Sequence, residues 1–329
     1  MNASTHTPGV AMRGQMAFRR LRAISRTLAD PPSRRHALAR RLAKGAERLT
    51  DSTYLALEYP PAAEDAPRFG WGKPAHARLN EILAARDAQY ADVLRGFLTF
   101  EESLLRIGTE PTATEPGWIQ HPAWMLGLDG VSLYGFVRSR GPGQYLEIGS
   151  GNSTKFVARA RRDGALDTRI TSIDPHPRAE IDELCDRVIR SPLESADLSV
   201  FEGLESGDVV FFDGSHRAFM NSDAVVFFTE ILPSLPPGVL VGVHDILLPW
   251  DYPPQWGARY YSEQYLLACY LLAEGSFVTP VLPCHYVSVK PELDAILAPL
   301  WGNDRMRGVD TRGFTCWLLT HELERGGIS

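Results

Sequence analysis

The sequence contains no long apolar run. Its longest stretches without a charged residue, Ile231–His244 and Gly275–Val289, are shorter than the roughly 20 residues that a membrane-spanning helix needs. Both are also interrupted by prolines, namely Pro233, Pro236, Pro237, Pro280 and Pro283. We therefore expect no transmembrane span and no integral membrane contact. The composition, 44% hydrophobic and 22% charged over 329 residues, is typical of a soluble globular protein with one large domain or two smaller ones.

Cysteine is scarce and dispersed. The four cysteines, Cys185, Cys269, Cys284 and Cys316, form no Cys-x-x-Cys pair. This spacing argues against a disulfide framework or a structural zinc site and favours a reducing, cytoplasmic location. The N-terminus lacks the continuous apolar core of a secretory signal, and Pro31-Pro32 interrupts the helix that a transit peptide would need.

Basic charge is concentrated near the N-terminus. Between Arg13 and Arg48, eleven Lys or Arg residues face only two acids, Asp30 and Glu47, which gives this segment a net charge of +9. Because the whole chain carries −6, the remaining residues carry −15. An acidic body of this kind is a poor general binder of nucleic acid, so we expect no nucleic-acid partner. The basic segment alone is suited to an acidic partner or an anionic membrane surface.

Three regions of the sequence differ in composition and in hydrophobic pattern. Residues 1–50 are predicted to form a basic, mobile arm in which Met16–Leu28 and Arg34–Leu49 have helical patterns. Residues 51–135 are predicted to form a helical and loop-containing N-terminal subdomain. Its main element is an amphipathic helix over Ala75–Phe100, and an ordered loop is expected over Pro116–Asp129. Residues 136–329 are predicted to form the main domain.

From Gly143 onward, short apolar runs alternate with amphipathic stretches. The candidate strands are Gln144–Gly149, Arg169–Asp174, Arg187–Arg190, Asp208–Asp213, Val239–His244, Phe277–Leu282 and Phe314–Thr320. The candidate helices between them are Ser153–Asp163, Arg178–Cys185, Ala218–Leu232 and Arg259–Leu272. This alternation predicts a Rossmann-like, doubly wound α/β domain with a parallel sheet covered on both faces.

Ligands of such a sheet bind beyond the carboxyl ends of its strands. The first strand ends in Gly149-Ser150-Gly151, where glycines permit a tight turn and a close approach to a ligand, and Asn152 or Ser153 can cap the next helix. The third glycine of a dinucleotide fingerprint is absent, which disfavours a dinucleotide-dependent oxidoreductase. Asp174, which ends the second strand, is placed to bind ribose hydroxyls. The alternative is an ordinary strand–helix turn with a capping aspartate.

The later strand ends make a family resemblance plain. They read Asp213-Gly214-Ser215-His216 and His244-Asp245-Ile246. Together with Leu146-Glu147-Ile148-Gly149 and Asp174, these motifs closely resemble class I S-adenosylmethionine-dependent methyltransferases, over about residues 143–275. The resemblance implies a seven-stranded sheet whose last strand is antiparallel.

The resemblance also implies which residues bind S-adenosylmethionine. Gly149 and Gly151 would lie under its methionine part, and Glu147 would orient that loop or the amino group of the cofactor. Asp174 would bind the ribose, and the segment from Ser191 to Leu193 would lie near the adenine. The full set of cofactor residues expected on this basis is Glu147, Gly149, Ser150, Gly151, Asn152, Ser153, Asp174, Ser191, Leu193 and Asp213.

Four residues are candidates for the reaction centre: Asp213, His216, His244 and Asp245. Because histidine accepts a proton near neutral pH, we favour His244 as the general base. His216 is an equally good candidate for a helix-start or adenine-side contact. The metal-dependent relatives place two adjacent oxygen ligands after the fifth strand, whereas His244 fills the first of those positions here. Asp213 and Asp245 are nevertheless suited to Mg²⁺.

The segment after the fifth strand is rich in aromatic residues. It supplies five candidates for binding the acceptor: Trp250, Tyr252, Tyr260, Tyr261 and Gln264. The alternative is a packed loop whose tyrosines anchor the next helix. The sequence thus predicts a methyltransferase that acts on a small molecule, with a hydroxyl of a sugar or secondary metabolite as the acceptor. The alternatives are N-methylation of a small amine and a non-catalytic nucleoside-binding protein of the same fold.

Overall fold

The computed structural model describes residues 32–47, 66–119, 125–273 and 276–322. Contacts divide the chain into two units, residues 1–63 and 64–329, and each is considered by itself. The described part of the first unit is one helix, α2 (Pro32–Glu47), close to the helix expected at its second basic stretch. The domain limits predicted at residues 50 and 135, and the mobility of the arm, stay predictions. No helix in the described ranges is both long and apolar enough to cross a membrane.

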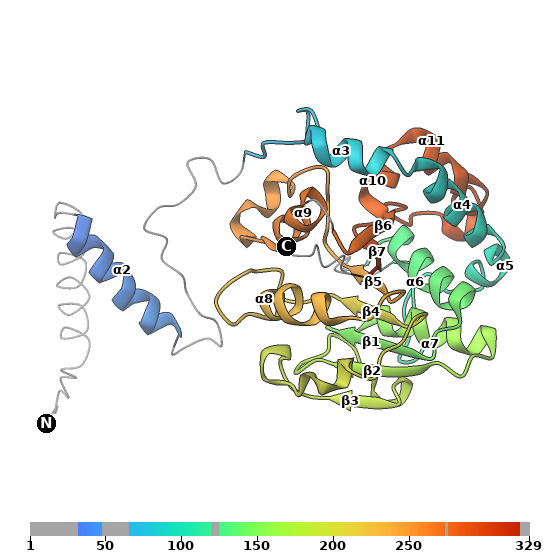
Figure 1. The fold of residues 1–329 in the computed structure, drawn as a ribbon, viewed down its shortest axis with the longest axis horizontal. Coiled ribbons are helices and arrows are strands. Elements are labelled where there is room, and N and C mark those ends of the chain that lie inside the picture. The colour runs from blue at the N-terminus through green and yellow to red at the C-terminus, as the bar shows by residue number, and fades with distance from the viewer. Residues whose placement is uncertain (1–31, 48–65, 120–124, 274–275, 323–329) are drawn as a thin grey trace, which may run out of the picture. The chain divides into compact units, whose positions relative to one another are not determined.

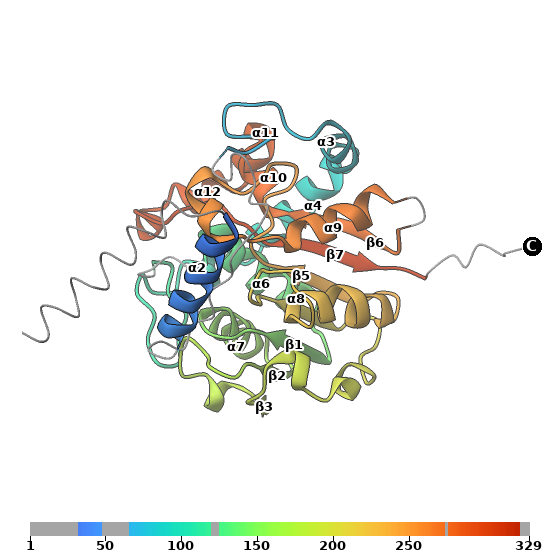
Figure 2. The same ribbon diagram turned by 90° about the vertical axis from the view of Figure 1, so that its left-hand side faces the viewer.

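Seven strands of the second unit form one sheet, in the order β3-β2-β1-β4-β5-β7-β6 (Figures 1 and 2). The strands are β1 (Gln144–Ile148), β2 (Arg169–Ile173), β3 (Arg187–Ile189), β4 (Val209–Phe212), β5 (Leu240–Val243), β6 (Val278–Pro283) and β7 (Cys316–Thr320). Strands β1 to β5 pair in parallel, and β7 is antiparallel to both of its neighbours. The predicted doubly wound, mostly parallel, seven-stranded sheet is confirmed.

The register of the central strands brings the predicted site residues to one edge. Ile148 of β1 is paired with Phe212 of β4, which is paired with Val243 of β5. All residues of β4 and β5 are buried, as expected for parallel strands that are covered on both faces. The residues that follow these strands therefore emerge side by side. The chain leaves β1 toward β2 on one side and reaches β4 on the other, so this edge is also the topological switch point.

Helices cover both faces of the sheet. One apolar core includes α4 (Asp87–Leu98), α6 (Gly127–Arg140) and α7 (Asn152–Gly164). The other core includes α8 (Asp223–Val226), the π-helical turn that continues it, and α9 (Glu263–Leu272). The remaining short helices are α3 (Ala77–Ala84), α5 (Glu101–Leu104), α10 (Cys284–Ser288), α11 (Pro291–Asp294) and α12 (Ala298–Trp301). The sequence does not predict α5, α6, α10, α11 or α12, and the first turn of α6 falls within the loop expected over Pro116–Asp129.

Two predicted helices differ from the structure. The helix expected over Ala75–Phe100 is divided into α3 and α4, because the chain turns at Arg86, whose Nε donates to the carbonyl of Pro280 in β6 (3.0 Å). The helix expected over Arg178–Cys185 is reduced to a single 3-10 turn, Asp182–Leu184. The N–H of Arg178 instead donates to the carbonyl of Ser150 (3.3 Å), which ties this segment to the turn after β1.

Candidate active site

The turn after β1 lies so close to the end of β4 that only glycine fits. Gly149 has φ +74°, and a Cβ atom there would lie 1.9 Å from the carbonyl oxygen of Asp213. Its N–H donates to the carbonyl of Ile173, the last residue of β2 (3.0 Å). Gly149 is thus held between the ends of two strands, and its lack of a side chain permits that approach.

Asp174 holds the same turn from the end of β2. Its Oδ2 accepts hydrogen bonds from the N–H (2.7 Å) and the hydroxyl (3.2 Å) of Ser150, and its Oδ1 accepts from the N–H of His176 (2.7 Å). An ionised carboxylate offers about four acceptor positions. Asp174 therefore keeps an acceptor position for a ligand while it fixes the glycine turn.

Glu147 supports the turn from within the sheet. It is fully buried, accepts a hydrogen bond from the hydroxyl of Tyr145 (3.1 Å) and also accepts one from the hydroxyl of Thr154. Thr154 in turn accepts from the N–H of Gly151 (3.2 Å). Burial raises the pKa of Glu147 to about 7. Of the two roles expected for Glu147, this geometry matches the one of orienting the loop.

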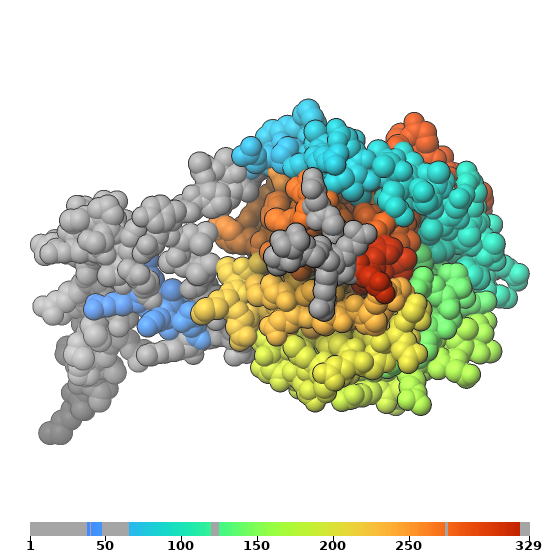
Figure 3. Space-filling model, in the orientation of Figure 1, coloured from blue at the N-terminus to red at the C-terminus, as the bar shows by residue number. Residues whose placement is uncertain are grey.

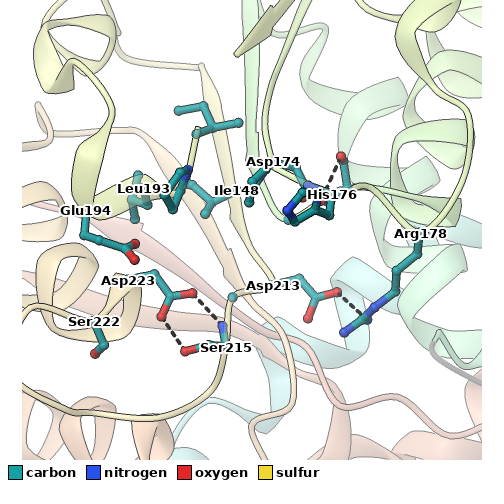
Figure 4. Close-up of a pocket in the computed structure, with 16 residues that line it drawn as sticks. Ile148, Asp174, His176, Arg178, Leu193, Glu194, Asp213, Ser215, Ser222 and Asp223 are labelled. Atoms are coloured by element: carbon teal, nitrogen blue, oxygen red, sulfur yellow. Dashed lines mark hydrogen bonds and ion pairs between the residues drawn. The ribbon is translucent and has the colours of Figure 1, made fainter. Parts of the chain in front are cut away.

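A cavity of about 340 Å³ opens at this edge of the sheet. Its apolar walls come from Ile148, Ile173 and Leu193, and its polar walls include Asp174 and Asp213 (Figure 4). Arg178 faces Asp213, with Nη1 and Oδ2 3.9 Å apart. The volume lies at the lower end of the roughly 300–1,000 Å³ that is usual for small-molecule sites.

Five of the ten expected cofactor residues do not line this cavity: Glu147, described above, and Gly151, Asn152, Ser153 and Ser191. Asn152 pairs with the backbone of Gly117, from whose N–H it accepts (3.4 Å) and to whose carbonyl it donates (3.2 Å). Ser191 donates to the carbonyl of Pro192 (3.1 Å), and Pro192, not Ser191, lines the cavity. Gly151 and Ser153, at the start of α7, do not line it either. The expected residues that do line it are Gly149, Ser150, Asp174, Leu193 and Asp213.

The four candidates for the reaction centre meet beside this cavity. Oδ1 of Asp213 lies 3.4 Å from His216 Nε2 and 3.4 Å from His244 Nδ1. Asp245 also lies between the two rings, with Oδ2 3.5 Å from His216 Nε2 and Oδ1 3.6 Å from His244 Nδ1. Asp213 therefore belongs both to the cavity wall and to the cluster.

Two further carboxylates complete the cluster, and neither was predicted. Glu263, the first residue of α9, places Oε1 2.6 Å from His216 Nδ1. Asp129 of α6 places Oδ2 3.6 Å from His244 Nε2, while its Oδ1 accepts from the N–H groups of Phe314 and Thr315 (2.8 Å each). Both acids are fully buried. An acid at a helix start is the only sequence signal that either one gives, and capping explains it equally well.

Among the two aspartates and two histidines of the cluster, only the aspartates are partly exposed to solvent. The side chains of Asp213 and Asp245 are 16% and 13% exposed, against 4% for each histidine. Neither ring nitrogen of His244 has a hydrogen-bond partner in the described ranges. Since buried polar atoms are rarely left unpaired, the space between the two aspartates is suited to a ligand oxygen or nitrogen.

The electrostatics of the cluster favour protonated histidines. Burial lowers the pKa of His216, but Glu263, followed by the two aspartates, raises it overall to about 9. The pKa of His244 is raised well above its usual value because Asp213 and Asp245 outweigh burial. Burial raises the pKa of Asp213, yet the neighbouring cations, above all His244, lower it overall to about 2. Burial raises the pKa of Asp245.

The aromatic segment after β5 is divided between packing and the site. Gln264 is a buried brace, because its Oε1 accepts from the N–H of Leu247 (3.0 Å) and its Nε2 donates to the carbonyl of Trp250 (3.4 Å). Trp250 packs edge-to-face on Trp71, and the hydroxyl of Tyr252 accepts from the N–H of Gln264 (3.4 Å).

Tyr261, one of the five expected acceptor residues, packs against a histidine of the reaction centre. Its ring centroid lies 4.5 Å from that of His216. Tyr260 is 40% exposed, with φ +55°. In the described ranges, no group of three or more His, Cys, Asp or Glu residues is arranged to hold a metal ion.

Residues 146–246 match a family model described as a methyltransferase domain. No curated protein matches the chain. The chain is similar to a solved O-methyltransferase from Bacillus cereus in complex with SAH, with 16% identity over 70% of this chain and 91% of that one and a TM-score of 0.36. A putative O-methyltransferase from Klebsiella pneumoniae is 14% identical over 75% of this chain and 97% of that one, with a TM-score of 0.35.

Proposed function

We propose that this chain, whose residues 146–246 match a methyltransferase domain, is a class I S-adenosylmethionine-dependent methyltransferase that methylates a hydroxyl group of a small molecule, either a sugar or a secondary metabolite. One observation carries the proposal. Nδ1 of His244 has no hydrogen-bond partner in the described part of the chain, and it faces two partly exposed aspartates beside the cavity at the switch point of the sheet. An acceptor oxygen bound there would supply that partner.

The cavity suits the cofactor. Gly149, whose missing Cβ lets the turn after β1 approach the end of β4, lines the cavity. Asp174 keeps an acceptor position for a ribose hydroxyl, and Leu193 and Ile173 supply apolar surface for a base. S-adenosylmethionine, when bound, supplies an electrophilic methyl group. The protein then has to align the acceptor oxygen for an in-line displacement and remove its proton.

We assign proton removal to His244. The acceptor hydroxyl would lie between Asp213 and Asp245 and donate to Nδ1 of His244, while Asp129 faces the opposite nitrogen. Buried carboxylates on both sides stabilise the imidazolium that forms. Because these carboxylates also raise the pKa of His244, the ring has to lose a proton before it can act as the base, so the reaction should be favoured above neutral pH.

N-methylation of an amine is the nearest alternative. A neutral amine already presents its lone pair and needs no base, so the His244 nitrogen would then have no chemical task. Non-catalytic binding of a nucleoside in the same fold is the second alternative. A binding protein does not turn over, so detection of a methylated product would exclude this second alternative.

The test combines a labelled methyl donor with metabolite extracts. The protein is incubated with S-adenosylmethionine that carries ¹³C in its methyl group, and labelled products are separated and examined by mass spectrometry and ¹³C NMR. We expect a methyl ether, whose carbon shift differs from that of an N-methyl group. The His244→Gln variant should bind S-adenosylmethionine as the wild type does but yield little product. A labelled N-methyl product, or the absence of any product, would contradict the proposal.

A further inference from the structure

Two arginines lie on the outer side of the reaction centre. Arg217 follows β4, and Arg259 precedes α9. In the described ranges neither side chain forms an ion pair, although most other arginines of the second unit that form printed side-chain contacts do. Unpaired guanidinium groups beside a cavity rich in carboxylates are consistent with a ligand of negative charge.

The guanidinium group of Arg217 is held in place by the backbone. Its Nε donates to the carbonyl of Arg259 (2.8 Å), and its Nη1 donates to the carbonyl of Ser215 (3.1 Å). A guanidinium group has five N–H donors, so three remain for a ligand. Because two bonds already fix the side chain, binding a ligand would cost little conformational entropy.

The two segments that carry these arginines are joined to each other. The N–H of Ser262 donates to the carbonyl of His216 (2.8 Å), and the hydroxyl of Ser262 accepts from the N–H of Ala218 (2.9 Å). Figure 3 shows the segment after β4, in yellow, against the segment before α9, in orange. The segments His216–Met220 and Trp256–Ser262 are thus joined by hydrogen bonds, and together we call them the rim.

Tyr261 connects this rim with the reaction centre. The centroid of its ring lies 4.5 Å from the ring of His216, and the guanidinium carbons of Arg217 and Arg259 lie 5.2 Å and 5.6 Å from the same centroid. Arg259 also lies over Trp256, at 4.6 Å. Stacking on aromatic faces leaves the N–H edges of guanidinium groups free to bind an anion in a bidentate way.

The rim also exposes apolar side chains. Met220 is 96% exposed, Phe219 46% and Tyr260 40%, and these residues are close neighbours of the two arginines in sequence. Large apolar side chains that are exposed together commonly mark a binding surface. The rim therefore offers positive charge and apolar contact at the same place.

We propose that the acceptor is an organic anion, a carboxylate or phosphate carried on an apolar body, and that Arg217 and Arg259 bind its anionic group. This inference rests on the proposed methyl-transfer function. The acceptor hydroxyl would lie between Asp213 and Asp245. The anionic group would lie on the rim, on the side of Tyr261 away from His216. The competing explanation is that the two arginines only balance the buried carboxylates of the cluster.

The experiment measures binding of defined probes to the protein saturated with S-adenosylhomocysteine. The probes are phenyl phosphate, benzoate and the uncharged benzyl alcohol, titrated by calorimetry or ligand-observed NMR. We expect at least one of the two anions to bind about tenfold more tightly than the alcohol, which is the effect of one charge-assisted contact. The preference should disappear in the Arg217→Gln/Arg259→Gln double variant.

Two further variants control the experiment. Arg187→Gln removes an exposed arginine at the first residue of β3, at the opposite edge of the sheet, and should keep the full preference. Arg217→Lys/Arg259→Lys keeps the charge without the bidentate geometry and should keep part of it. Unchanged affinity for S-adenosylhomocysteine shows that each variant is folded.

Two outcomes would overturn the inference: no preference for the anions in the wild type, or a preference that survives in the double glutamine variant. The second outcome would favour the charge-balancing explanation. Failure of the wild type to bind S-adenosylhomocysteine would instead refute the proposed function. The probe titrations, repeated without S-adenosylhomocysteine, would still decide on the two arginines.

Discussion

Replacing Glu263 by Gln should change the protonation of the reaction centre without changing its shape. Oε1 of Glu263 lies 2.6 Å from Nδ1 of His216, and the glutamate is fully buried. A glutamine of the same size keeps an acceptor oxygen for that nitrogen but removes the negative charge. The variant therefore isolates the electrostatic part of the contact.

The size of the effect follows from the shift of His216. Its pKa is raised from 6.5 to about 9 even though burial acts in the opposite direction, and Glu263 is the largest cause of the increase. A shift of this size corresponds to about 3 kcal/mol, at 1.36 kcal/mol for each pKa unit. Without the charge of Glu263 we expect the pKa of His216 to fall by at least about one unit, with the two aspartates preserving the rest.

The sign of the stability effect is the same for both partners. A histidine whose pKa is raised on folding contributes stability that is complete below pH 6.5 and is lost as the pH rises toward about 9. Burial raises the pKa of Glu263 from 4.5 to about 7, so stability is also lost as this glutamate ionises between those values. The Glu263→Gln variant removes the second loss and reduces the first. Its free energy of unfolding should therefore fall less steeply with pH between about 4.5 and 9 than that of the wild type.

NMR titration of the histidine rings measures the first effect, and urea unfolding at several pH values measures the second. The chain has nine histidines, and the resonance of His216 is assigned with a His216→Gln variant. Glu230→Gln, an exposed position in the π-helical turn after α8, is the matched control and should change neither quantity. A pKa of His216 that stays near 9 in the Glu263→Gln variant would refute the reasoning and leave Asp213 and Asp245 as the cause.

Four other outcomes are expected. Replacing Asp174 by Ala should weaken S-adenosylmethionine binding by roughly 1.5–3 kcal/mol in calorimetry, whereas the exposed Asp167→Ala should not; equal affinities would exclude a role for Asp174. In the His244→Gln variant kcat should fall by about 10²–10⁴-fold with Kd for the cofactor unchanged. Wild-type turnover should rise with pH above neutrality because the raised pKa keeps the ring protonated at pH 7, and EDTA should not affect it. Loss of activity to EDTA with recovery on adding Mg²⁺ would assign activation to a metal. A chain that begins at Thr50 should keep its Tm and its cofactor affinity; a large fall in Tm would show that the basic arm packs on the body.

The sheet could be predicted because its signals are local. The runs are short and rich in Val, Ile, Leu and Phe, and three of them end at Gly149, Asp174 or Asp213. These local signals place each strand to within one or two residues. The helix expected over Arg178–Cys185 shows where such signals fail. Its periodicity was correct for an amphipathic helix, but a hydrogen bond from Arg178 to Ser150, distant in sequence, determines the conformation.

The residues of the candidate site also differ in whether local sequence signals predict their positions. Asp213 and His244 directly follow neighbouring parallel strands, so sequence order was enough to bring them together. Asp129 and Glu263 reach the cluster from the starts of helices, whose positions depend on packing against other elements. The sequence predicts that Gln264 binds the acceptor; in the structure its side chain bonds to backbone groups in the turn after β5. The need of a buried turn for such a partner cannot be read from the sequence.

Backbone conformation adds an independent argument for the cluster. His216 and Asp245 both have positive φ, +65° and +55°, although neither is glycine. Such conformations are unfavourable for residues with a Cβ atom and persist only where the surrounding structure enforces them. At His216 the enforcing contacts are the carboxylate of Glu263 and the hydrogen bond from the N–H of Ser262 to its carbonyl. These two strained residues follow different strands, yet their side chains approach to 3.5 Å, between Nε2 and Oδ2. A glycine at either position would relieve the strain but remove the contact, so the strained backbone favours the proposed role of these two residues in the reaction centre.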